Sequence, residues 1–214
     1  MVDFSLLSGN FGLCDDPQVV DSHTDFNADG CTELLDFSLL AANFGRAGAT
    51  VGVSAQSMAS GPVVMTMQPT RPNVAVGGMF DVVVDVHAGD VSVDGAAVFL
   101  DFDPAVLQVR AVSPGDVLST VIRQAVDTAS GHVDFAAGRL GSQASGSFRL
   151  VTITFEVIGD APQATIAASL TTLRRTDVTG SGQSVLGQPP QPVTIAIGNA
   201  AASAYRLFLP VIMR

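Results

Sequence analysis

Two patterns of hydrophobic and polar positions divide the chain. In residues 3–12 and 36–45, Phe and Leu recur three or four positions apart, which predicts two short helices, each ending on a Gly suited to a helix C-terminus. After residue 62, short apolar runs alternate with turn-forming residues and show no helical period, which predicts an all-β sandwich. The predicted strand runs are residues 62–69, 79–88, 96–103, 106–112, 131–138, 148–159, 164–173 and 192–198.

The two predicted helices belong to an internal repeat. DFSLLSGNFG at residues 3–12 returns as DFSLLAANFG at residues 36–45, an offset of 33 residues with eight of ten positions identical. Helices this short do not bury an apolar face alone, so we expect the two to pack face to face.

The loop before the second helix, DFNADGCTELLD at residues 25–36, has the spacing of a calcium loop. Oxygen-bearing side chains fall at positions 1, 3, 5 and 12, with Gly30 at the sharp turn of position 6 and Glu33 at position 9. Position 12 is Asp, shorter than the Glu common in EF-hand loops, so the loop would have to close tightly. The alternative is an Asn/Asp-rich turn that caps the following helix. The predicted calcium ligands are Asp25, Asn27, Asp29, the Cys31 carbonyl and Asp36.

Charge is concentrated in this first region. Residues 1–45 hold seven Asp, one Glu and no basic residue, a charge of −8, while the rest of the chain carries −2 of the total of −10. The chain therefore offers no basic groove for nucleic acid or for an anionic membrane. No run approaches the roughly 20 apolar residues of a membrane span.

The duplicated loop-and-helix pattern of residues 1–45 resembles a dockerin, the small calcium-dependent module of cellulosome-type assemblies. The resemblance covers loop and helix in the second repeat and only the helix in the first, because Asp3 stands where loop position 12 would be. It implies calcium as the cofactor and a helical surface that binds a partner. Leu34 and Leu35, at the start of the second helix, are the expected contacts on that surface.

The β region resembles a cohesin, the usual partner of dockerins. The similar stretches are VAVGGMFDVVVDV, VDGAAVFLDFDPAVLQVRAVSPGDVL, FRLVTITFEV and PVTIAIG, with DFDP as the sharpest local motif. The resemblance implies a mainly β chain, a cohesin-like jelly-roll β-sandwich preceded by a small α-helical, EF-hand-like dockerin module. The expected domains are a partial dockerin-like calcium module at 1–45, a Gly/Ser-rich linker at 46–62, the sandwich at 63–198 and an apolar tail at 199–214.

Alternation along residues 95–102 separates two faces of one predicted strand. Ala96, Val98, Leu100 and Phe102 form the apolar set expected in the core, and the other set is expected to face outward. In cohesins the outward face contacts the dockerin, so the resemblance implies a partner site there, with Phe99 as a hydrophobic anchor. The alternative is that a loop or the C-terminal tail covers Phe99. The expected partner-binding residues of this face are Ala97, Phe99 and Asp101.

The two cysteines, Cys14 and Cys31, both lie in the first region. If the protein is exported, a disulfide that closes this small module is expected, since a small core benefits from a covalent link. Two unrelated buried thiols are the alternative.

Catalytic patterns are missing from the sequence. Asp101 and Asp103 stand two apart at a strand end directly before Pro104, which favours a turn over a carboxylate pair. The three His are scattered and no nucleophile motif occurs. We therefore expect no enzyme but an extracellular or cell-surface adapter that joins dockerin- or cohesin-bearing proteins and is able to self-associate head to tail. The alternatives are a carbohydrate-binding module, which the absence of Trp disfavours, and a structural surface domain.

Overall fold

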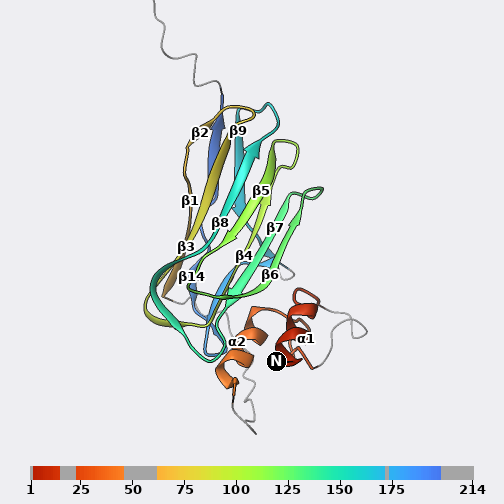
Figure 1. Ribbon diagram of the computed structural model, residues 1–214, viewed down its shortest axis with the longest axis vertical. Helices are drawn as coiled ribbons and strands as arrows, with labels where there is room; N and C mark the ends of the chain where they lie inside the picture. Colours follow the sequence, from red (N-terminus) through yellow and green to blue (C-terminus); the bar gives the residue numbers. More distant parts are fainter. Residues whose placement is uncertain (1, 15–22, 46–61, 172–173, 199–214) are drawn as a thin grey trace, which may run out of the picture.

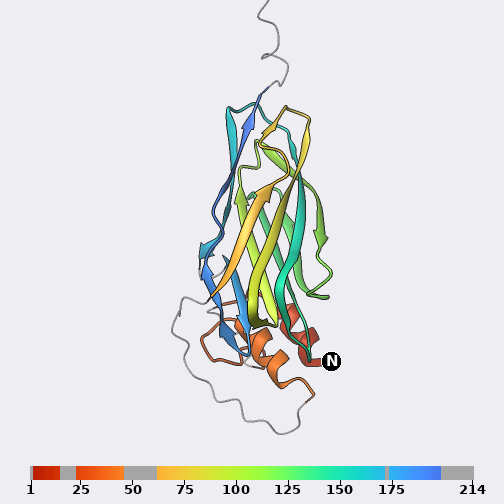
Figure 2. The same cartoon turned by 90° about the vertical axis from the view of Figure 1, so that its left-hand side faces the viewer.

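A computed structural model describes residues 2–14, 23–45, 62–171 and 174–198. Two helices lie at one end of an elongated β-sandwich, as two views at right angles show (Figures 1 and 2). The expected linker, apart from Pro62, and the expected tail lie outside the described residues. The helices are α1 (Val2–Asn10) and α2 (Leu34–Asn43). The strands are β1 (Val63–Pro69), β2 (Asn73–Val74), β3 (Met79–Val93), β4 (Gly95–Phe102), β5 (Leu107–Pro114), β6 (Thr120–Asp127), β7 (His132–Gly138), β8 (Ala144–Val157), β9 (Gln163–Ala168), β10 (Leu170–Thr171), β11 (Arg174–Arg175), β12 (Asp177–Gly180), β13 (Gln183–Ser184), β14 (Leu186–Gln188) and β15 (Val193–Ile197).

Two sheets form the sandwich. One has the strand order β14-β1-β3-β8-β5, and the other runs β13-β12-β4-β9-β15-β2, with β7 beside β4 and β6 beside β7. Most pairs are antiparallel, whereas β1 with β14 and β15 with β2 are parallel. The predicted all-β sandwich is therefore confirmed. Every predicted strand run overlaps an observed strand, and β6 is a strand that the sequence pattern did not predict.

The main core lies between the two sheets. Strand β3 illustrates why, because its buried positions alternate with partly or fully exposed ones from Phe80 to Ala88, the period of a half-buried strand. Aromatic rings fill the centre. The Phe80 and Phe155 rings stack at 5.7 Å between centroids, and Phe102 meets Phe155 edge to face at 5.4 Å.

The two helices end where the sequence predicts. Gly12 follows α1 at φ +89° and Gly45 follows α2 at φ +79°, a left-handed conformation that glycine adopts without a steric penalty. The helices touch through Phe4 and Phe37, whose rings meet edge to face at 6.3 Å. Face-to-face packing of the helices accounts for only part of their burial, because both also pack against the sandwich. None of the helices in the described part of the chain is long and apolar enough to cross a membrane.

Candidate partner-binding face and calcium loop

Strand β4 presents two faces, as its alternation predicts. Ala96, Val98, Leu100 and Phe102 belong to the core between the sheets. Ala97 and Phe99 point the other way, into a second apolar cluster that β4, β6 and β7 share with the two helices. The other residues of this second cluster are Leu7, Phe11, Leu34, Phe37, Ala41, Ile122 and Ala136.

Small residues make the centre of this outer face flat. In the register of β4 with β7, Gly95 lies opposite Gly138 and Ala97 opposite Ala136, and we call these four residues the platform. The ring of Phe37 lies directly over it, since a Cβ atom added to Gly138 would stand 2.1 Å from Phe37 Cε1. The absence of larger side chains at these positions is therefore what lets α2 approach the sheet.

Phe99 is buried under the helices, with 6% of its surface exposed. It lies in the cluster with Phe11 and Leu34, and the guanidinium carbon of Arg174 is 5.9 Å from its ring centroid. Phe99 lies on the outer face of β4, as the alternation predicts, and the helices of the same chain cover it there; its role as a partner contact stays a prediction. Among the described residues, the helical region is what covers Phe99.

Leu34 and Leu35 are also buried, at 3% and 6% exposure. Leu34 faces the platform, where its Cδ1 atom lies 3.0 Å from the point that a Gly95 Cβ would occupy. Within this chain the two leucines are therefore covered, and their role as partner contacts stays a prediction. Their apolar side chains are already removed from water within the chain.

A charged network borders the covered face. Arg174 donates hydrogen bonds to Asp134 (2.9 Å) and to Asp101, and its guanidinium lies 3.1 Å from His132 Nδ1. Asp101 keeps a half-exposed side chain and also lies 2.8 Å from His132 Nδ1. On the far side of Asp134, Arg123 donates to this carboxylate at 3.1 Å and to the Phe11 carbonyl at 3.2 Å, which links the sheet to the end of α1.

Asp94 forms a second polar link between the sandwich and α2, and no sequence pattern signals it. This almost fully buried carboxylate accepts hydrogen bonds from the Thr179 hydroxyl (3.1 Å) and the Ser181 N–H (2.7 Å), and it also interacts with the Ser38 hydroxyl of α2. Burial raises the pKa of Asp94, and these hydrogen bonds partly offset the rise. Ser38 in turn accepts the Gly182 N–H at 2.7 Å. Sequence pattern gave no signal here, since Asp94 next to Gly95 looks like an ordinary turn.

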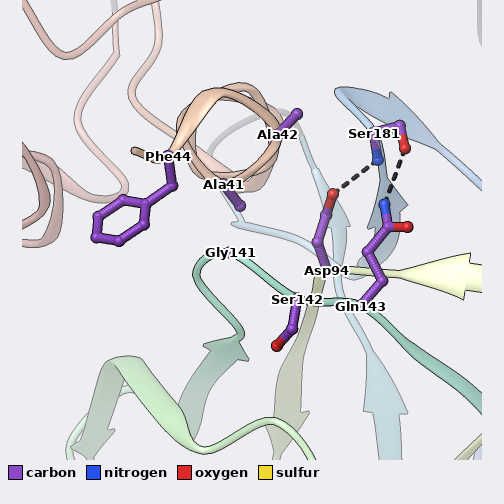
Figure 3. A pocket seen from close by; sticks show the side chains of 8 residues that line it. All are labelled: Ala41, Ala42, Phe44, Asp94, Gly141, Ser142, Gln143 and Ser181. Carbon is purple, nitrogen blue, oxygen red and sulfur yellow. Dashed lines mark hydrogen bonds between the residues drawn. The ribbon is translucent and has the colours of Figure 1, made fainter. Parts of the chain in front are cut away.

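A cavity of about 460 Å³ remains beside this link (Figure 3). Phe44 and Ala41 border it from α2, and Gln143 borders it from the loop before β8, where its amide donates to the Ser181 hydroxyl at 2.9 Å. The contact between α2 and the sandwich is thus tight over the platform and open at this end.

The predicted calcium loop is folded back on itself. Asp25 accepts the N–H groups of Asp29 (3.2 Å) and Gly30 (3.0 Å), and Asp29 accepts that of Cys31 (3.0 Å). Gly30 has φ +91°, which fits the sharp turn expected at position 6. The loop therefore has the turn geometry that the sequence implies.

Asp36, at position 12, reaches across the loop. It accepts the Phe26 N–H at 2.7 Å with one oxygen and the Glu33 N–H at 2.8 Å with the other, so it closes the loop and caps α2. Burial raises the pKa of Asp36 to about 7, against the lowering effect of these hydrogen bonds. Burial, with the neighbouring Asp29 and Asp36, likewise raises the pKa of Glu33 to about 7.

The loop residues suit calcium by their chemistry, although the described residues contain no group of three or more His, Cys, Asp or Glu side chains arranged to hold a metal ion. Carboxylate and amide oxygens are the ligands that calcium takes. An oxygen that accepts one N–H keeps a further lone pair for a cation. Asp36 is shorter than the Glu common at position 12, so the loop has to close tightly, and the hydrogen bond from the Phe26 N–H to Asp36 closes it in this way.

Cys14 and Cys31 form a disulfide with an S–S distance of 2.10 Å. It joins the segment after α1 to the loop before α2, beside hydrogen bonds from the Gly12 N–H to the Thr32 carbonyl (2.8 Å) and from the Thr32 N–H to the Leu13 carbonyl (2.9 Å). The two repeats are thus tied together by covalent and backbone links.

Comparison with known proteins identifies the sandwich. The family model described as "Cohesin domain" matches residues 65–185, more than half of the chain. A comparison with curated protein sequences finds no match.

Solved structures share the fold. The seventh ScaB type I cohesin of Pseudobacteroides cellulosolvens is 16% identical with a TM-score of 0.54, and the alignment covers 67% of this chain and 96% of that one. The third ScaC cohesin of Acetivibrio cellulolyticus, solved in complex with the ScaB dockerin, is 12% identical with a TM-score of 0.54, covering 63% and 98%. A type II cohesin from the cellulosome of the same organism is 15% identical with a TM-score of 0.51, covering 62% and 94%. At these identities the likeness establishes the fold. The match to the family model shows that the chain belongs to the cohesin family of non-catalytic binding modules.

Proposed function

We propose that the chain is an extracellular adapter whose cohesin sandwich binds dockerin-type helical modules through the platform of β4 and β7. The observation that carries the proposal is the pair of helices seated on that face, with Phe37 above Gly138. Solved cohesins of similar fold have been crystallised with dockerins, among them the ScaC cohesin with the ScaB dockerin. An apolar centre with a polar rim is the usual anatomy of such a contact.

The finer assignment of the N-terminal region also belongs to this proposal. Residues 1–45 are a partial, EF-hand-like dockerin module that binds calcium through Asp25, Asn27, Asp29, the Cys31 carbonyl and Asp36. The support is the folded loop, closed by Asp36, and the sequence repeat. Residues 46–62 are a linker, and residues 199–214 a tail. The disulfide supports an extracellular or cell-surface location, because such bonds persist in oxidising compartments.

Binding of a purified dockerin-bearing protein to the intact chain, measured by biolayer interferometry at concentrations high enough to displace the chain's own helices from the platform, tests the adapter function. Ala97→Arg places a long charged side chain on the platform and is expected to abolish binding. Ala111→Arg is the matched control, since Ala111 is exposed on β5 in the other sheet, and binding is expected to persist. Equal binding by both variants, or no binding of any dockerin in a panel, would refute the proposal. Retention of the chain on cellulose would instead support the carbohydrate-binding alternative.

A further inference from the structure

The platform is shaped for an aromatic ring carried by a helix. Gly95 and Gly138 are paired across β4 and β7, and a Cβ atom at either position would come within 3.2 Å of a Phe37 ring carbon. Leu34, one turn before Phe37, lies beside Gly95 of this pair. Any larger residue at these two positions would push α2 off the sheet, so the fit is specific to the side chains that α2 presents.

The contact has the anatomy of a protein–protein interface more than of a domain core. Its apolar centre of Phe37, Leu34 and Phe99 is bordered by a few side-chain hydrogen bonds, from Arg123 to the Phe11 carbonyl and from the Gly182 N–H to Ser38. Within the described ranges, no strand pairing joins the helices to the sheets. An open pocket of about 460 Å³ lies at the end of α2 (Figure 3), so the helix and the sandwich do not meet along the whole contact.

Arginines of the sandwich reach its contact with the helices. Residues 1–45 carry −8 with no basic residue. The sandwich meets them with Arg123 and Arg174 at the rim and with Arg175, which lines a small crevice together with Glu33. Each of these Arg also pairs with a carboxylate of the sandwich, Arg123 and Arg174 with Asp134 and Arg175 with Asp177, so little of their charge is left to attract residues 1–45.

We propose that the platform also takes α2 of a second copy of this chain, so that closure within one chain and exchange between two chains are alternative forms of the same contact. The only covalent link between the partners is the segment of residues 46–61, 16 residues rich in Gly, Ala and Ser. Linkers of this length and composition hold two modules near each other at an effective concentration of the order of millimolar. The closed monomer therefore dominates in dilute solution. Exchange between two chains dominates when the linker is too short to join α2 to β1 of the same sandwich. Reciprocal exchange yields a two-fold dimer, and one-way exchange yields an open chain of molecules.

Removal of residues 46–61 tests the exchange. The end of α2 and the start of β1 lie apart in both views (Figures 1 and 2), so a chain in which Gly45 is joined directly to Pro62 cannot close on itself. The intact chain is expected to be a monomer by light scattering at micromolar concentrations, and the shortened chain to show at least twice the monomer mass. A shortened chain that stays monomeric with its helices folded, as judged by circular dichroism, would overturn the proposal.

Two Phe variants of the shortened chain decide which surface associates. Phe37→Ser removes the ring from the platform and is expected to restore the monomer. Phe44→Ser is the matched control, because Phe44 follows the same helix but is 39% exposed and does not reach the platform, and association is expected to persist. Association that survives Phe37→Ser would overturn the proposal.

A second measurement covers the case in which the deletion unfolds the helices. A protease site is placed within residues 46–61 of the otherwise unchanged chain, and the chain is cut after folding. The helical fragment is expected to co-elute with the sandwich on gel filtration and to exchange with an added, fluorescently labelled fragment. Complete separation of the fragments would overturn the proposal. The proposed exchange rests on the proposed function, because it treats the helices as a separable module. Its test uses only the chain itself. A failure to bind foreign dockerins would therefore leave the outcome of the exchange test unaffected.

Discussion

Replacement of Phe99 by Ala should release the helices from the sandwich without unfolding the sandwich itself. Phe99 belongs to the cluster shared with the helices and not to the core between the sheets. Removal of a buried Phe ring costs about 3 to 5 kcal/mol. The stacked Arg174 contributes about 0.5 to 1 kcal/mol of this at a partly exposed site. Because Phe99 lies at a domain contact that can relax, we expect about 3 kcal/mol, at the lower end of this range.

Hydrogen exchange followed by mass spectrometry measures this loss element by element. Amides of α2 that exchange through separation of the helices should exchange faster by about 100-fold, since each 1.4 kcal/mol is a factor of ten. Amides of β3 and β8, in the centre of the five-stranded sheet, should keep their rates. Phe148→Ala is the matched control, because Phe148 is equally buried at 7% but belongs to the core between the sheets, and it should accelerate β3 and β8. The reasoning is refuted if Phe99→Ala accelerates β3 and β8 as much as α2, or leaves α2 unchanged.

Three further predictions concern calcium, the disulfide and pH. The intact chain should take up calcium in a calorimetric titration and Asp25→Ala should not; a folded chain without calcium uptake would show that the loop is only a cap for α2. Thiol titration under denaturing, non-reducing conditions should find no free thiol, and reduction should lower the free energy of unfolding by about 3 kcal/mol in the chain-entropy model for a loop with Cys14 and Cys31 17 residues apart; two free thiols would exclude the bond. Because folding raises the pKa of Asp94 above its unfolded value of about 3.9, its contribution to stability is present below that pH and is lost as the pH rises through the higher folded-state pKa. The stability of the wild type relative to Asp94→Asn should therefore fall as the pH is raised from about 4, in denaturant titrations, and a difference that does not vary with pH would contradict this assignment.

Much of the sandwich could be predicted from the sequence because half-buried strands alternate. The turn after β4 is an example, since Asp103 accepts the Ala105 N–H at 2.8 Å as the DFDP motif suggests. Strand β6 could not be predicted, because it is an edge strand in which only Ile122 is buried. Strand β12 is four residues long and buried throughout, so it has neither the length nor the alternation of a recognisable strand.

The candidate site was predictable only in part. Alternation along β4 placed Phe99 on the outer face, but a pattern along one strand does not specify which element covers that face. The role of Gly95 depends on its pairing with Gly138, 43 positions later, and such a pairing is fixed by the three-dimensional register. The link between Ser38 and Asp94 is equally non-local: Ser38 belongs to the helical repeat and Asp94 to the cohesin-like stretch, and neither pattern indicates that the two meet. The sequence therefore predicted the loop, the helices and the faces of β4. It did not predict that the helices pack against the outer face of β4.

The direction of the first and last long strands has a mechanical consequence. β1 begins at the end of the sandwich near the helices and β15 finishes at the opposite end, so tension on both ends acts along the strand axes (Figures 1 and 2). Hydrogen bonds between strands run roughly perpendicular to the strands, so this tension loads the ladder of β1 with β3 and the ladder of β15 with β9 in shear. In shear all bonds of a ladder resist together, whereas in peeling they break one after another. Tension applied to the two ends of the sandwich would therefore be opposed by all the hydrogen bonds of these two ladders at once.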